Sequence, residues 1–155
     1  MIPTGGKLSR EPIPFGDSYV DMNYYVVRDG ASVYTMMWTT GPETAESDSS
    51  VIKSILMGFL RGVGAGYEKL GGQFSCTPNA GSDISTGGFT GRGFNLTGCT
   101  IPAAARVFTK AGDGKRQVYL GAVFYSEKDE NVDRFIQSFT TKPAEAPKSQ
   151  AKDSK

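Results

Sequence analysis

The chain has 155 residues, of which 38% are hydrophobic, and a formal net charge of +1. This length favours one domain with a hydrophobic core of its own. The near-neutral charge lacks the basic excess expected of a nucleic-acid-binding protein. The sequence contains no histidine, which excludes histidine-based triads, histidine general bases and histidine-containing metal sites. Its two cysteines are too few for a four-cysteine metal site within one chain.

The two ends of the chain differ in composition from its middle. Residues 1–16 contain three of the eight prolines and predict an extended lead-in. Residues 142–155 consist of Lys, Ala, Pro, Glu, Ser, Gln and Asp, which is typical of a disordered tail. Residues 17–141 are expected to form a single domain. No stretch of 18 uncharged apolar residues occurs, so no transmembrane segment is expected.

Six β-rich runs predict strands. They are, in chain order, 19–28, 32–40, 73–77, 93–97, 103–110 and 117–125. The first two flank Asp29-Gly30, which predicts a β-hairpin, and a turn within residues 110–115 predicts a second hairpin between the last two.

Two helices are expected between and after these strands. Apolar residues at spacings of three and four predict an amphipathic helix over residues 51–70, capped by Asp48 or Ser49 and ended by Gly71-Gly72. A capping box at residues 126–129 opens the second helix. Its buried face is expected to comprise Val132, Phe135, Ile136 and Phe139. The resulting order, β-β-α-β-β-β-β-α, predicts an α+β fold in which helices pack on an antiparallel β-sheet.

Glycines interrupt the first predicted helix. Gly58, Gly62 and Gly66 are spaced by four residues, with Gly64 between them. A glycine in a helix interior costs up to about 1 kcal/mol relative to alanine, so the pattern needs a compensating reason. One explanation is close packing of the helix backbone on a sheet, or a helix that ends near Gly62. The other is a partner or ligand that approaches the bare surface.

The two cysteines predict the compartment. Cys76 and Cys99 are expected to form a disulfide, which implies an oxidising environment. The alternative is two free thiols in a cytosolic protein. The first 16 residues lack the apolar region of a signal peptide. We therefore expect a periplasmic or secreted protein that begins after a removed leader, with a cytoplasmic location as the alternative.

No catalytic residue, metal site or cofactor is predicted. The glycine-rich segment 87–93 matches neither phosphate-binding nor dinucleotide-binding motifs. Arg92 within it could hold an anion, although a solvated arginine explains it as well. A Ser-x-x-Lys sequence at Ser50–Lys53 lacks the companion motifs of serine–lysine enzymes.

Three stretches resemble the PsbP-like superfamily, which includes the photosystem II extrinsic subunit, a Ran-binding import factor and many small bacterial envelope proteins. The first is the strand pair 19–28 and 33–39 followed by one amphipathic helix. The second, 88–94, is similar to a G-x-x-G-R-E-[FV] strand entry, with Gly93 where an acid is common. The third, 118–139, is similar to a closing strand and an R-F-[IL]-x-S-F helix. The resemblance covers residues 13–141 and implies an α/β/α sandwich, typically without catalysis; it transfers no site residues.

From these observations we expect a non-catalytic binding or scaffolding module that engages a protein or a component of the cell envelope. The first alternative is a small-molecule binding protein with an apolar pocket between helix and sheet. A hydrolase without histidine is the less favoured alternative. The oligomeric state is left open. The candidate contacts with a ligand or partner are Trp38, Gly62, Gly66, Tyr67 and Arg92.

Overall fold

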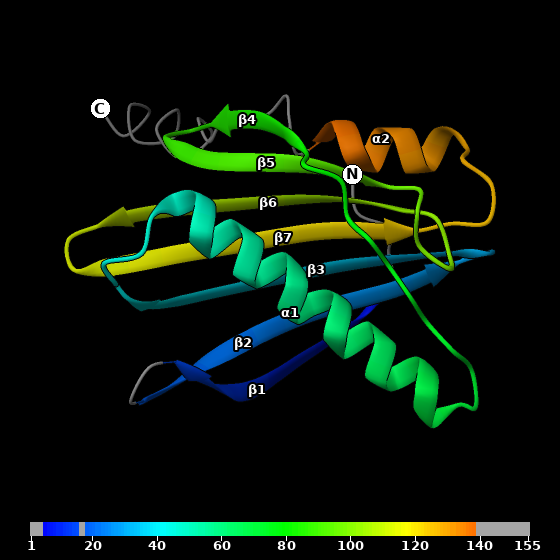
Figure 1. Cartoon of the computed structure of the whole chain (residues 1–155), viewed down its shortest axis with the longest axis horizontal. Helices are drawn as coiled ribbons and strands as arrows, with labels where there is room; N and C mark the ends of the chain where they lie inside the picture. Colours follow the sequence, from blue (N-terminus) through cyan, green and yellow to red (C-terminus); the bar gives the residue numbers. More distant parts are fainter. Residues whose placement is uncertain (1–4, 16–17, 139–155) are drawn as a thin grey trace, which may run out of the picture.

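The fold is built on one large antiparallel sheet, as the computed structural model shows for residues 5–15 and 18–138 (Figure 1). The strands are β1 (Lys7–Phe15), β2 (Ser18–Asp29), β3 (Ser32–Pro42), β4 (Ser82–Thr86), β5 (Phe89–Leu96), β6 (Ala103–Gly112) and β7 (Lys115–Phe124). The helices are α1 (Asp48–Lys69) and α2 (Glu130–Ser138).

The sheet consists of two meanders that meet in its centre. The strand order is β1-β2-β3-β7-β6-β5-β4, and every neighbouring pair is antiparallel. The chain leaves the sheet after β3, forms α1, and later returns so that β7 pairs with β3. Both predicted hairpins are confirmed: β2 pairs with β3 across the turn at Gly30 and Ala31, and β6 pairs with β7 across the turn that follows Gly112.

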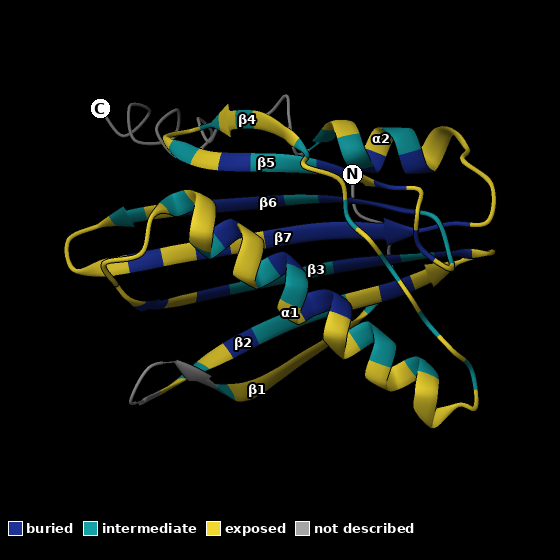
Figure 2. Cartoon of the chain, viewed as in Figure 1, coloured by how far each residue is buried: buried dark blue, intermediate teal, exposed yellow. Residues whose placement is uncertain are grey.

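Each face of the sheet carries its own hydrophobic cluster, because successive side chains of a strand point to opposite faces. On one face, α1 contributes Ile52, Leu56, Phe59 and Leu60. These pack with alternate residues of the central strands, among them Ala105, Val107, Leu120 and Phe124. On the other face, Val132 and Phe135 of α2 pack with Tyr34, Ala104 and Val123. Figure 2 shows that burial is concentrated in β6 and β7, whereas β1 is mostly exposed.

The expected α+β sandwich, with helices packed as layers on the sheet, is wrong. The structure is 48% strand and 24% helix, so the sheet dominates the fold. Helix α1 crosses the sheet diagonally and packs chiefly on β5 and β6, while α2 is a single helix of 9 residues. Neither helix covers a whole face, because seven strands make a sheet much wider than one helix.

Three strand assignments also differ from the sequence analysis. Residues 7–15, expected to be a lead-in, form the edge strand β1, which pairs with β2 along its whole length. Residues 73–77, expected to be a strand, belong to no strand. Ser75 in this segment instead bonds to Thr100, with N–O distances of 2.9 Å for Thr100 N to Ser75 O and 2.8 Å for Ser75 N to Thr100 Oγ1. The short strand β4 follows this segment and was not predicted.

Both helix starts are shifted slightly from the predicted positions. The N-cap of α1 is Ser47, whose hydroxyl accepts a hydrogen bond from the backbone N–H of Ser50. The side chain of Asp129 accepts a hydrogen bond of 2.9 Å from the backbone N–H of Val132 at the start of α2. Val132 and Phe135 are buried as predicted, whereas Phe139 and residues 142–155 lie outside the described residues.

The predicted disulfide is confirmed, since Cys76 and Cys99 are bonded. The bridge joins the segment after α1 to the connection between β5 and β6, and Cys99 belongs to the hydrophobic cluster beneath α1. It is compatible with an oxidising extracellular compartment. Neither helix of the described chain is long and apolar enough to cross a membrane.

Candidate functional site

Helix α1 forms a ridge across one face of the sheet, with a hollow on each side of it. We call the hollow between α1 and β5 the β5 hollow and define it by Lys53, Leu56, Arg92 and Phe94. The hollow between α1 and β1, β2 and β3 is the β1–β3 groove, defined by Met22, Met37, Gly58 and Gly62. The two hollows exist because α1 is packed chiefly on β5 and β6 and leaves the first three strands open.

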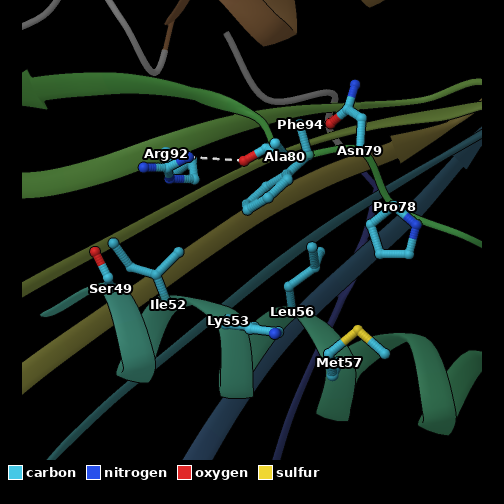
Figure 3. A pocket seen from close by; sticks show the side chains of 10 residues that line it. All are labelled: Ser49, Ile52, Lys53, Leu56, Met57, Pro78, Asn79, Ala80, Arg92 and Phe94. Carbon is cyan, nitrogen blue, oxygen red and sulfur yellow. Dashed lines mark hydrogen bonds between the residues drawn. The ribbon is translucent and has the colours of Figure 1, made fainter. Parts of the chain in front are cut away.

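The β5 hollow, with a volume of about 410 Å³, is drawn in Figure 3. Its floor is formed by Leu56 of α1 and Phe94 of β5, and Lys53 and Arg92 lie at its rim. Arg92 is already engaged there, because its guanidinium donates to Ala80 O at 2.7 Å and forms an ion pair of 2.6 Å with Asp83. The arginine therefore fixes the turn before β4 and has its charge balanced by a carboxylate.

The β1–β3 groove is larger, with a volume of about 610 Å³. The apolar part of its sheet side is formed by Ile13, Met22, Val26 and Met37. Its helix side is formed by Ile55, Gly58, Phe59, Gly62 and Val63. Val26 is 41% exposed although its neighbours in the groove are apolar, so part of this surface has no covering from the described chain. An apolar surface of this kind gains free energy when a ligand covers it.

The helix glycines are not required by packing within the fold. A Cβ atom placed at Gly62 or Gly66 meets no atom of another residue within 4 Å. At Gly58 the nearest such atom is Arg61 Nη2, at 4.0 Å, and at Gly64 it is Cδ2 of Phe74, at 3.6 Å. Both distances allow ordinary van der Waals contact. Close packing of the helix backbone on the sheet therefore does not explain these glycines, and the helix continues past all of them to Lys69.

Polar groups lie at the β1 side of the groove. The hydroxyl of Tyr24 on β2 donates a hydrogen bond of 2.9 Å to Oε1 of Glu11 on β1. Burial, together with this bond and the negative charge of Glu11, raises the pKa of Tyr24 to about 12. Ser9 on β1 lines the same side of the groove, and Thr35 lines it from β3. The groove thus combines an apolar body with a small polar region, the usual composition of a site for a small organic molecule.

The structure separates the candidate contacts that the sequence analysis grouped together. Gly62 lines the groove, and Gly66 lies one turn further along the same helix. Tyr67 packs against Phe74, with 5.8 Å between ring centroids. Trp38 lies on the opposite face of the sheet, because its neighbour Met37 faces α1. Arg92 belongs to the β5 hollow.

The sequence analysis did not identify the residues that β1, β2 and β3 contribute to the groove. Alternation along β2 places Met22, Tyr24 and Val26 on one face, and this signal was available in the sequence. The sequence did not predict that β1 lies beside these residues, because residues 1–16 were expected to be an extended lead-in and not a strand. Glu11 was therefore not recognised as the partner of Tyr24.

Residues 5–15 and 18–138 contain no group of three or more Asp, Glu or Cys side chains placed to hold a metal ion. No protein-family model, curated protein or solved structure matches the chain significantly. The resemblance to the PsbP-like superfamily therefore stays a prediction.

Proposed function

We propose that this protein is a non-catalytic binding protein that holds a small apolar molecule in the β1–β3 groove. The observation that carries the proposal is the pair Gly58 and Gly62. These glycines destabilise the helix by up to about 1 kcal/mol each relative to alanine, yet the described fold does not need the space they leave. A ligand that lies against the helix backbone explains both.

The size and composition of the groove support the same proposal. A volume of about 610 Å³ lies within the range of roughly 300–1,000 Å³ that is typical of small-molecule sites. We favour a small molecule over a protein or envelope component because the site is a hollow between helix and sheet. A flat apolar patch would instead favour a protein partner. Tyr24 and Glu11 would orient a ligand that carries one hydrogen-bonding group.

The disulfide supports a place of action outside the cytosol. A Cys76–Cys99 bridge persists in oxidising compartments and is rare in the cytosol. We therefore place the proposed activity in the periplasm or the cell envelope, where a binding protein would meet apolar molecules that have left a membrane.

The proposal is tested with N-phenyl-1-naphthylamine, an uncharged probe whose fluorescence increases in apolar surroundings. The test variant is Gly62→Leu, which fills the groove, and the matched control is Gly66→Leu on the next turn of α1. Neither new side chain meets a neighbour within 4 Å of its Cβ, and both remove a helix-interior glycine. Both variants should therefore fold, which circular dichroism and thermal unfolding will check.

We expect the wild-type protein and Gly66→Leu to bind the probe with similar affinity. We expect Gly62→Leu to bind at least about tenfold more weakly, because one leucine side chain occupies the volume that the ligand needs. Equal binding by the two variants, or no binding by the wild-type protein, would contradict the proposal.

A further inference from the structure

Arg106 lies on the face of the sheet opposite the β1–β3 groove. Its strand neighbour Ala104 packs into the cluster under α2, and alternation along β6 places Arg106 on that same face. The residues that pair with Arg106 on the two adjacent strands are both glycines, Gly93 on β5 and Gly121 on β7. The arginine therefore has no side chain directly beside it on either neighbouring strand.

The guanidinium of Arg106 makes few of the hydrogen bonds that its N–H groups could donate. It donates one hydrogen bond, from Nη1 to Ala105 O at 3.1 Å. Its Nε is shielded from solvent and has no hydrogen-bond partner. Burial lowers the pKa of Arg106 from its ordinary value, and no carboxylate of residues 5–15 or 18–138 offsets this effect. A shielded N–H donor without a partner is costly, so the Nε of Arg106 requires an explanation.

Two other arginines of the described chain each have a carboxylate partner. Arg116 pairs with Asp48 at 2.7 Å, and Arg92 pairs with Asp83 at 2.6 Å. Arg116 also has a shielded Nε without a partner, but Asp48 balances its charge. Among the described residues no carboxylate pairs with Arg106, and a cavity lies beside it. The cavity has a volume of about 400 Å³ and is also lined by Asn79, Ser82 and Asn95.

Gly93 permits this position of the arginine. A Cβ atom at Gly93 would lie 3.0 Å from Cζ, Nε and Nη1 of Arg106, which is tighter than almost all real contacts of a Cβ atom. A larger residue would push the guanidinium away from the backbone of β5. The glycine therefore keeps the guanidinium flat against the sheet at the edge of the cavity.

We propose that Arg106 and the cavity beside it bind a small oxyanion, a carboxylate or a phosphate group, through the Nη1 and Nη2 N–H groups that the described residues leave without a partner. A planar guanidinium presents paired N–H groups that two oxygens of one anion can accept at once. Asn79, Ser82 and Asn95 supply neutral polar side chains around the same cavity and no opposing negative charge. This site is independent of the groove, since it lies on the other face of the sheet.

The most direct test observes Arg106 in the wild-type protein. The side-chain Nε–H resonances of 15N-labelled arginine are recorded by nuclear magnetic resonance during separate titrations with inorganic phosphate and with succinate. We expect one resonance, which is absent from Arg106→Gln, to move saturably with at least one of the two anions. The anion that moves it at lower concentration identifies the oxyanion type. If neither anion moves this resonance, the proposal is wrong.

A matched pair of variants tests the role of the charge. Arg106→Gln and Arg10→Gln each remove one positive charge from the same face, but Arg10 lies on the far edge strand β1 and donates to Asn23 at 3.1 Å. By calorimetry we expect Arg106→Gln to weaken binding by roughly tenfold to a hundredfold, and Arg10→Gln to leave it unchanged. Equal losses in the two variants would show a non-specific effect of charge and overturn the proposal.

Discussion

Arg116 on β7 and Asp48 in the first turn of α1 form an ion pair of 2.7 Å that ties the helix to the sheet. The side chain of Arg116 is only 4% exposed. It also donates to Thr109 Oγ1 at 3.1 Å and to Glu46 O at 2.9 Å. One arginine thus joins two strands, the loop before α1 and the helix start. This contact holds the start of α1 on the sheet.

Replacing Asp48 should therefore destabilise the protein. The variant Asp48→Ala removes the one carboxylate that pairs with the shielded Arg116 among the described residues. We therefore expect the free energy of unfolding to fall by about 1–3 kcal/mol. The control is Asp83→Ala, which breaks an ion pair whose aspartate is 86% exposed and should cost less than about 1 kcal/mol. Urea denaturation measures both values, and a larger effect for Asp83 would contradict this account.

Reduction of the disulfide should loosen the connection after α1. The cysteines are separated by 23 positions, for which the chain-entropy model gives a stabilisation of roughly 3 kcal/mol. We expect the double variant with Cys76→Ser and Cys99→Ser to lose about that much by urea denaturation. Thiol titration of the unreduced, denatured wild-type protein should find no free thiol. Two free thiols would remove both the bridge and the argument for an oxidising compartment.

Tyr24 should ionise at unusually high pH. Its pKa is raised from 10.0 to about 12, first by burial and then by Glu11, so the folded state holds the phenolic proton more tightly than the unfolded state. The resulting stabilisation is complete below pH 10 and disappears as the pH rises through 12. Absorbance of the phenolate, compared between wild type and Tyr24→Phe, isolates this tyrosine.

The variant Glu11→Gln separates the two causes. It removes the negative charge and leaves the burial, so we expect the pKa of Tyr24 to fall only part of the way towards 10.0. A pKa that does not change in Glu11→Gln would show that the negative charge of Glu11 does not act on Tyr24 and would contradict this account.

The strands and helices with strong local patterns could be predicted from the sequence, but the edge of the sheet could not. Residues 7–15 contain Pro12 and Pro14, which argue against a strand because proline cannot donate to a strand ladder. An edge strand tolerates proline on its free side, and β1 is an edge strand. Residues 73–77 have a β-rich composition but form no strand. Ser75 in this segment bonds to Thr100, and Cys76 forms the disulfide with Cys99.

The candidate site was only partly predictable, because part of it depends on contacts between segments that are distant in the sequence. The spacing of Gly58, Gly62 and Gly66 is visible in the sequence and led to Gly62. Which strands face these glycines depends on the diagonal path of α1 across the sheet, and no local pattern encodes that path. Trp38 was accordingly placed near the helix, although it lies on the opposite face.

The most direct test of the central claim uses the methionines as reporters. Met22 and Met37 line the β1–β3 groove, Met57 lines the β5 hollow, and Met36 lies on the opposite face of the sheet. Methyl resonances of 13C-labelled methionine are recorded with and without N-phenyl-1-naphthylamine. We expect the resonances of Met22 and Met37 to move, and those of Met36 and Met57 to stay in place. Movement of Met36 or Met57 without Met22 and Met37 would contradict the claim that the groove beside the helix glycines is the binding site.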